Sequence, residues 1–334
     1  MFSRNASNDN TDFKDLKDLK NIKDLKDSKA PTGFKDIIVQ SVSPSIRTTA
    51  WLLKIMIPIS FAVCLAQFYG IIAWCAQWLN PLFCHIGLPG ASSIAFLTGA
   101  TSTTYAALAV MMTMELTLRQ ATIIAIMVLI CHALPLECTV NKKVGSKPFR
   151  MAFLRICGAL LAALYLNFFL PEMSEPFSAL SVSAADATIL QVLLNWLLSS
   201  LKLSAMIFGI IYALMLVQKL MEKYGLMQKL EKPLSPLMVF FGLPSNSAYL
   251  WLVGNVLGIS YGSAVMLQLE EEGKITREEA DEVNYHLIMN HSMLEDTLVF
   301  ATAGVSAVWI LSTRLLFAFI LVWCRKAVKR LFRN

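Results

Sequence analysis

Residues 79–89 read LNPLFCHIGLP, and residues 234–244 read LSPLMVFFGLP. Both segments place a Pro-Leu pair and a later Gly-Leu-Pro at the same spacing. A second match follows each of them. Residues 132–139 read HALPLECT and residues 291–297 read HSMLEDT, with one residue gained or lost between the histidine and the glutamate. Two matches in the same order indicate that one structural unit occurs twice in the chain.

The composition around these segments is that of a membrane protein. The chain has 334 residues, of which 56% are hydrophobic and 16% charged, and its mean hydropathy is +0.58. Soluble globular proteins average about 25% charged residues, so this composition excludes a soluble enzyme, a disordered chain, a collagen and a disulfide scaffold. The net charge of +6 comes from the N-terminal tail and the loops, where membrane topology explains it. We therefore expect no nucleic-acid partner.

Long apolar runs, separated by short charged segments, give the predicted membrane crossings, each of which needs about 20 residues. They are 51–79, 120–138, 151–170, 189–221, the more polar 283–297, and 298–323. Lys and Arg collect before the first crossing, between the second and third, after the fourth and after the last. Residues 171–186 instead carry acidic groups without Lys or Arg. The positive-inside rule therefore places both termini in the cytoplasm and residues 171–186 outside.

This charge pattern can be met only if two further runs, 91–112 and 247–269, enter the membrane and return on the same side. Each half then has three crossings and one re-entrant hairpin or broken helix. Because three is odd, similar halves face opposite sides, which is the inverted-repeat arrangement of many secondary transporters. We predict an all-α integral membrane protein, multi-pass in a bacterial cell (inner) membrane, with a low-complexity cytoplasmic tail at 1–46 and repeats at 47–175 and 186–334.

The Gly-Leu-Pro segments resemble the Gate ("nucleoside recognition") domain, since they continue as Gly90-x-Ser92 in the first half and Ser245-x-Ser247 in the second. That domain is shared by concentrative nucleoside transporters, the membrane part of the ferrous-iron transport GTPase B, and spore maturation proteins A and B. The resemblance covers about residues 50–325 and implies a transport path with two Gate repeats. It does not bring GTPase activity, because no GxxxxGK[ST] phosphate loop occurs.

The two Gly-Leu-Pro segments also predict helix starts that contact substrate. Proline suits the first turn of a helix, because it lacks the N–H that a first turn leaves unpaired. If the helices begin inside the protein, their remaining free N–H groups point at whatever occupies the cavity. The predicted substrate-binding residues are Pro89, Gly90, Ser92, Ser93, Ser245, Asn246 and Ser247. Helix capping without ligand contact is the alternative for their polar side chains. Pro244 is the equivalent of Pro89 at the second predicted helix start.

The His and Glu residues of the second match are candidates for ion binding or coupling, because ionisable groups inside a membrane are costly and mark functional sites. His291 and Glu295 are four residues apart, which predicts one shared helical face. In the first half, Pro135 lies between His132 and Glu137 and predicts a helix break.

Three roles for these residues stay open. They could bind protons, since histidine titrates near neutral pH. They could bind a divalent metal through His132, Glu137, His291 and Glu295, since imidazole and carboxylate both serve transition metals. They could also form hydrogen bonds that only hold the helices together. Asp296 joins the set as an acidic residue without a counterpart in the first half, where Cys138 stands.

We predict a membrane transporter that moves a small polar solute between two inverted repeats, with proton or cation coupling left open. The resemblance implies a nucleoside-like metabolite. A divalent-metal (ferrous-iron-like) transporter is the alternative within transport, and an intramembrane enzyme or a membrane scaffold are alternatives outside it. We expect no enzyme activity and no cofactor, since no HExxH motif occurs. The expected partners are the lipid bilayer and a small-molecule or ion substrate, and a homo-oligomer stays open.

Overall fold

The computed structural model describes residues 33–177 and 188–332, and these residues fold into helices with no strand among them. Residues 1–32, which hold most of the predicted tail, lie outside the described part of the chain. Helix α2 begins at Phe34. Residues 34–46, which the sequence assigned to the tail, are therefore helical.

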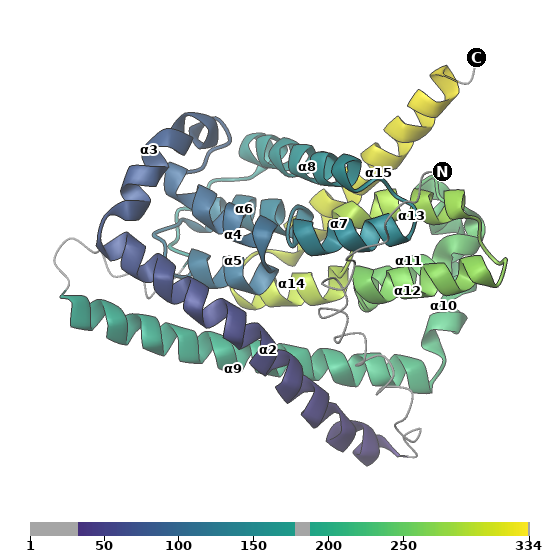
Figure 1. The fold of residues 1–334 in the computed structure, drawn as a ribbon, viewed down its shortest axis with the longest axis horizontal. Helices are drawn as coiled ribbons and strands as arrows, with labels where there is room; N and C mark the ends of the chain where they lie inside the picture. Colours follow the sequence, from purple (N-terminus) through teal and green to yellow (C-terminus); the bar gives the residue numbers. More distant parts are fainter. Residues whose placement is uncertain (1–32, 178–187, 333–334) are drawn as a thin grey trace, which may run out of the picture.

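The first half of the molecule runs from α2 to α8 (Figure 1). In chain order its elements are α2 (Phe34–Phe68), α3 (Ile71–Cys84), the short 3-10 helix η2 (Gly90–Ser92), α4 (Ser93–Thr101), α5 (Thr104–Met111), α6 (Leu118–Ile130), α7 (Leu134–Lys143) and α8 (Pro148–Phe169). The second half contains α9 (Ile189–Lys223), α10 (Leu226–Phe240), η3 (Ser245–Ser247), α11 (Ala248–Val256), α12 (Ile259–Glu271), α13 (Arg277–Asn290), α14 (Met293–Thr302) and α15 (Ala307–Leu331).

The helices of the two halves begin at constant separations. Helices α2 and α9 begin 155 positions apart, at Phe34 and Ile189, and the same separation holds through α5 and α12. From α6 and α13 onward the separation is 159, because the second half has four extra residues between the starts of α12 and α13.

The starts of α6 and α13 also use the same local device. Thr117 and Gln120 form a reciprocal capping box at α6, in which each side chain bonds the backbone N–H of the other residue. Thr276 and Glu279, 159 positions later, form the same box at α13. The two helices therefore begin by the same side-chain chemistry at equivalent positions.

Among the described residues, five helices are long and apolar enough to cross a membrane. They cover 34–68, 118–143 (α6 and α7 taken together), 148–169, 189–221 and 307–331. The predicted crossing 283–297 is instead divided between α13 and α14. The predicted boundary before residue 298 is wrong, because α14 continues to Thr302 and the turn at Gly304, with φ +102°, separates it from α15.

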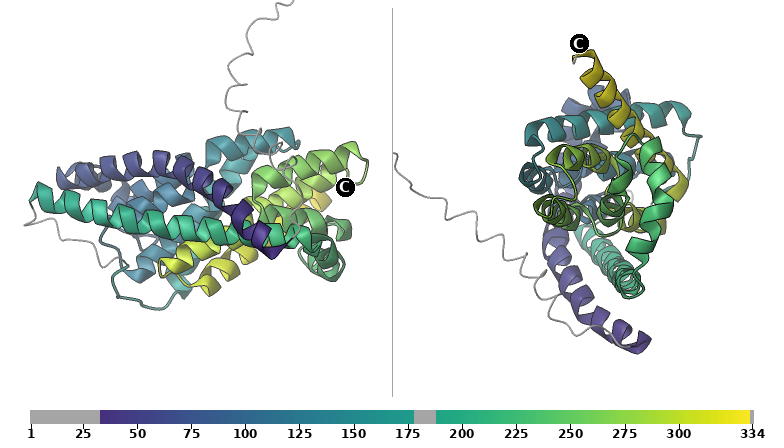
Figure 2. Two further views of the ribbon diagram at one scale, coloured as in Figure 1. Left: turned by 90° about the horizontal axis from the view of Figure 1, so that it is seen from below. Right: turned by 90° about the vertical axis from the view of Figure 1, so that its right-hand side faces the viewer.

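Helices α6 and α13 lie in the interior and are covered by α8 and α15 (Figure 1). Every residue of α6 from Ala121 to Ile130 is buried, which explains its continuous apolar sequence. The long helices α2 and α9 lie side by side along one face, as Figure 1 and the left view of Figure 2 show. They are antiparallel, since the Trp196 indole near the start of α9 donates to Ser60 Oγ near the end of α2 at 3.2 Å.

The two predicted re-entrant runs each form a pair of short helices. Helix α5 packs back against α4, and α12 packs back against α11. Glycine permits these contacts. A Cβ added to Gly99 would lie 3.2 Å from the Cβ of Ala107, and one added to Gly262 would lie 3.2 Å from the Cα of Gly254. The helical-hairpin form predicted for both runs is present.

Candidate functional site

Two helices are broken at equivalent points by residues in the left-handed backbone region. Ala133, with φ +47°, separates α6 from α7, and Ser292, with φ +51°, separates α13 from α14. A side chain in this region costs about 1–2 kcal/mol per residue. The Ala133 N–H donates to the carbonyl of Gly99 at 2.9 Å, and the Ser292 N–H donates to that of Gly254 at 3.1 Å. Each break is therefore held by the hairpin of its own half.

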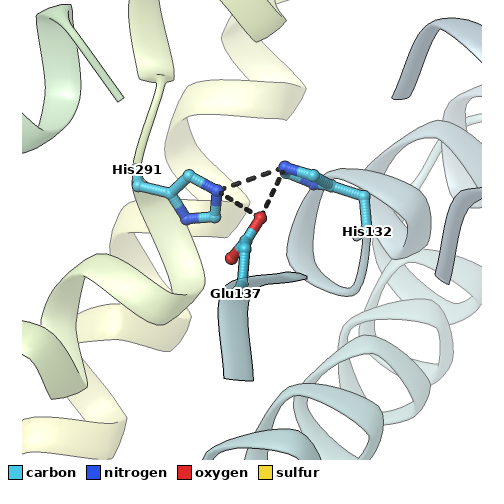
Figure 3. Close-up of side chains that lie close together, drawn as sticks. All are labelled: His132, Glu137 and His291. Carbon is cyan, nitrogen blue, oxygen red and sulfur yellow. Dashed lines mark hydrogen bonds and ion pairs between the residues drawn. The ribbon is translucent and has the colours of Figure 1, made fainter. Parts of the chain in front are cut away.

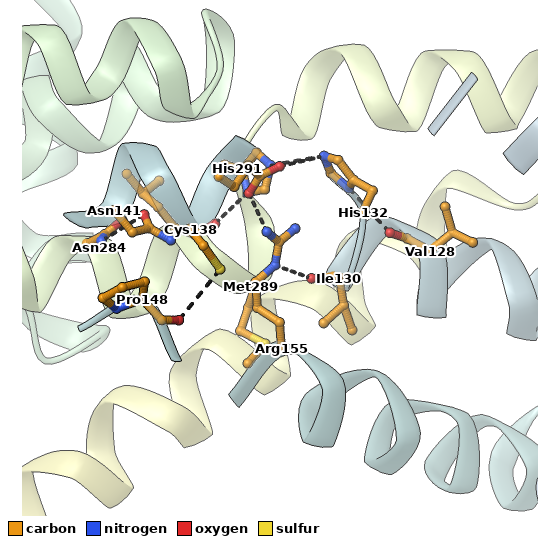
Figure 4. A network of polar contacts seen from close by, with 12 residues as sticks. Val128, Ile130, His132, Cys138, Asn141, Pro148, Arg155, Asn284, Met289 and His291 are labelled. Atoms are coloured by element: carbon orange, nitrogen blue, oxygen red, sulfur yellow. Dashed lines mark hydrogen bonds and ion pairs between the residues drawn. The ribbon is translucent and has the colours of Figure 1, made fainter. Parts of the chain in front are cut away.

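A buried arginine binds the carbonyl groups that each break exposes. Arg155 Nε donates to the carbonyl of Ile130 at 2.7 Å, at the end of α6. Arg314 Nε donates to the carbonyl of Met289 at 3.1 Å, and its Nη2 donates to that of His291 at 2.6 Å. Both arginine side chains are fully buried. A cation is favoured there because the last carbonyls of a helix carry partial negative charge. Figure 4 shows the Arg155 contacts.

Each of these arginines also holds a carboxylate. Arg155 Nη1 pairs with Glu137 Oε2, and Arg314 Nη1 lies 3.0 Å from Asp296 Oδ2. Glu137 and Asp296 are 159 positions apart, as are the two arginines. Asp296 is therefore the counterpart of Glu137, with no residue gained or lost. The predicted alignment of Glu137 with Glu295 is wrong, and so is the prediction that Asp296 lacks an acidic counterpart.

His132 and His291 face each other where the two halves meet (Figure 3). Their Nε2 atoms are 3.1 Å apart, and each lies 3.1 Å from Oε1 of Glu137. All three residues are buried, with exposed fractions of 8% for His132, 3% for Glu137 and 1% for His291. The structure thus brings together three of the predicted ion-binding residues, two from the first half and one from the second.

The second nitrogen of each histidine ring fixes the position of its proton. Nδ1 of His132 lies 3.3 Å from the carbonyl of Val128, and Nδ1 of His291 lies 2.9 Å from that of Leu287. A carbonyl only accepts, so Nδ1 carries the proton of each neutral ring and Nε2 presents a lone pair. Two lone pairs and a carboxylate oxygen of Glu137 then point at one another. These three electron-rich atoms repel one another unless a cation, either a proton or a metal ion, lies between them.

Glu295 lies outside this cluster. Its Oε1 accepts a hydrogen bond of 2.5 Å from the Tyr105 hydroxyl of α5. The prediction that His291 and Glu295 share a helical face is wrong, because α13 ends at Asn290, His291 is its C-cap, and Ser292 separates it from α14. The break predicted in the first half is present at residues 131–133, and Pro135 lies in the first turn of α7.

The predicted substrate-binding residues lie at the starts of η2 and η3. The hydroxyl groups of Ser92, Ser93 and Ser247 are buried and each donates to a backbone carbonyl three residues earlier, at 2.6–2.7 Å. Ser245 and Asn246 are exposed. Figure 1 places α3 and α10, which precede the two starts, at opposite ends of the molecule. These hydroxyl groups donate to carbonyls of their own turn, and no side-chain capping bond is present at the starts of η2, α4, η3 or α11. The predicted ligand contact stays a prediction.

A second polar cluster also joins the halves, and we call Ser146, Arg150, Asp281, Tyr285 and Arg325 the Asp281 cluster. Asp281 accepts a 2.5 Å hydrogen bond from Ser146, pairs with Arg325, and lies 3.7 Å from Arg150. Both guanidinium groups lie over the Tyr285 ring, at 3.8 and 5.1 Å from its centre. Two residues of the cluster come from the first half and three from the second.

The equivalent positions of the two halves do not repeat the Asp281 cluster. The positions shifted by 159 residues hold Thr122, Ile126, Leu166, Val305 and Trp309. Except for Trp309, which is half-buried, these side chains are buried. The Asp281 cluster is therefore a feature in which the two halves differ.

Sequence reasoning missed Arg155, Arg314 and Tyr105. The two arginines had a visible signal, since each interrupts an apolar run, 151–170 or 298–323, where a charge marks a functional residue by default. Tyr105 had none, because its partner is distant in sequence. Residues 258–262 read GISYG, with the GxSxG spacing of hydrolases, but they follow helix α11 and not the strand that this motif requires.

The fold defines an integral membrane protein whose buried polar groups gather between two halves. Residues 49–166 match the Gate family, described as "Nucleoside recognition". The chain is also similar to the uncharacterized membrane protein YvoD of Bacillus subtilis (strain 168). The identity is 27% over 282 residues, which cover 82% of this chain and 89% of that relative. No solved structure matches the chain.

Proposed function

We propose that the chain is a membrane transporter in which a small polar solute passes between two inverted repeats, coupled to a cation held by His132, His291 and Glu137. The observation that carries the proposal is the contact between the two histidines, which joins the helix breaks of both halves in a buried site. Interrupted helices that meet at a repeat interface are the usual setting of a transport site. The Gate description favours a nucleoside-like solute.

Two further observations support inverted repeats. Equivalent helices begin at constant separations of 155 and then 159 residues. The equivalent helices α2 and α9 run antiparallel, as expected when one copy faces the opposite side of the membrane. Within this proposal the bilayer is that of the cell (inner) membrane and both termini are cytoplasmic, in line with the loop charges.

The proposal gives the site no catalytic role. Glu137 and Asp296 are paired with Arg155 and Arg314, and Glu295 is bonded to a tyrosine. Carboxylates held in this way are positioned for structure and ion binding. The low-complexity tail is likewise assigned no part in solute movement.

Transport can be measured with the full-length protein in liposomes. We expect uptake of radiolabelled uridine above that of empty liposomes when a pH or divalent-cation gradient is imposed. His132→Gln and His291→Gln should bring uptake down to the empty-liposome level, while His85→Gln, a change at an exposed histidine, should leave it unchanged. Uptake that stays at background for uridine and for divalent cations, under every gradient, would contradict a transport function.

A further inference from the structure

We infer that His132, His291 and Glu137 form a binding site for a divalent transition-metal ion. The three ligand atoms are 3.1 Å from one another. Metal–ligand distances are about 2.1 Å for imidazole nitrogen and carboxylate oxygen, which puts adjacent ligands of an octahedral shell about 3.0 Å apart. The three atoms therefore already have the spacing of ligands on one face of such a shell.

The groups behind these atoms are arranged as they are around a bound metal. A metal-binding histidine normally donates its other ring N–H to a carbonyl or carboxylate, which fixes the ring. His132 and His291 do so to the carbonyls of Val128 and Leu287. The second oxygen of Glu137 is held by Arg155. The ligands are thus oriented by the protein before any metal arrives.

The donor set indicates the class of metal. Two imidazole nitrogens and one carboxylate oxygen suit Mn²⁺, Fe²⁺, Co²⁺ or Zn²⁺. Ca²⁺ and Mg²⁺ prefer all-oxygen sites, and Cu⁺ prefers sulfur. The group contains no thiolate, so a first-row divalent transition metal fits it best.

The charge and the ligand number suit an ion that binds and leaves. Glu137 is the one carboxylate among the three ligands, so the group carries a single negative charge when both imidazoles are neutral. This charge favours a cation. Three protein ligands leave open positions, in contrast to the four ligands of a closed structural zinc site. Arg155 also neutralises part of the charge of Glu137, so Glu137 binds a metal less strongly.

The ligands are divided between the halves, since His132 and Glu137 belong to the first and His291 to the second. Any motion that separates the halves takes the site apart. The metal would then be the ion that the transporter carries, and this assignment of its fate rests on the function proposed above. Binding itself can be measured without transport.

The binding test uses the full-length protein in detergent, stripped of metal with a chelator and titrated with Co²⁺. We expect one equivalent to bind, with the visible absorption bands of protein-bound Co²⁺. His132→Gln, His291→Gln and Glu137→Gln should each weaken binding by more than about tenfold. Glu295→Gln and His85→Gln are the matched controls and should bind as the unaltered protein does, because both residues lie outside the ligand group.

An X-ray absorption spectrum of the Co²⁺-loaded unaltered protein keeps the inference testable if a variant fails to fold. Two imidazoles in the metal shell support the site. Failure to bind Co²⁺, Mn²⁺ or Zn²⁺, a shell without imidazole, or unchanged binding in both histidine variants would overturn it. Uridine uptake without metal binding would support the transport function and contradict the metal site. Metal binding without uptake of uridine or Co²⁺ would support the metal site and contradict the transport function.

Discussion

At the scale of single residues, Arg155 and Arg314 perform one task at two equivalent positions. Each caps the carbonyls of a broken helix and pairs with a carboxylate of the helix that follows. A buried charge is costly alone and becomes tolerable when it is paired and hydrogen-bonded. Each buried carboxylate is therefore stabilised in its charged form by its arginine.

Removing one arginine should leave its partner as an uncompensated buried charge. We expect Arg155→Met and Arg314→Met each to destabilise the protein by about 3–5 kcal/mol, measured as a lower unfolding temperature in detergent. The double change Arg155→Met with Glu137→Leu should recover part of the loss, because the pair is then replaced by apolar groups. Lys143→Met, at an exposed position, is the control. A double variant less stable than Arg155→Met would contradict this account.

At the scale of elements, the hairpins α4–α5 and α11–α12 depend on glycine at close contacts. A Cβ at Gly254 would lie 2.6 Å from a methyl carbon of Leu287, and one at Gly99 would lie 2.8 Å from a methyl carbon of Val128. Leu287 and Val128 also supply the carbonyls that bind His291 and His132. The hairpins thus pack directly against the residues whose carbonyls orient the histidines.

Alanine at these glycines should overpack the hairpins. We expect Gly99→Ala and Gly254→Ala each to cost about 1–3 kcal/mol in unfolding measurements. Gly209→Ala in α9 is a matched control with nothing within 4 Å of the added carbon, and it should be neutral or stabilise by up to about 1 kcal/mol through helix propensity. Equal effects at the three sites would show that the close contacts are unimportant.

The elements also show how far the sequence could be interpreted. The apolar runs and the Gly-Leu-Pro matches predicted the long helices and both hairpins. Ser292 carried no such signal, since serine seldom adopts a left-handed conformation and nothing local demands a break after His291. Without that break, helical spacing pairs His291 with Glu295. The pairing of Glu137 with His291 depends on contact between the halves, which no local pattern reports.

At the scale of the whole molecule, inverted repeats predict that equivalent surface positions face opposite sides of the membrane. Cys84 at the end of α3 and Val239 in α10 are 155 positions apart and both are exposed. In a background without other cysteines, we expect Cys84 to react with a membrane-impermeant thiol reagent from outside and Val239→Cys only from inside. Phe332→Cys, near the C-terminus, serves as the inside reference. Labelling of both positions from one side would refute the inverted arrangement.

The Asp281 cluster joins the two halves by ionic contacts that the equivalent positions do not repeat. Dissolved salt weakens ionic contacts by screening. In the proposed transport cycle, high salt should therefore favour the conformation in which the halves are apart at the Asp281 cluster. A molecule built from matching halves can thus prefer one orientation to the other, and the ionic strength can change that preference.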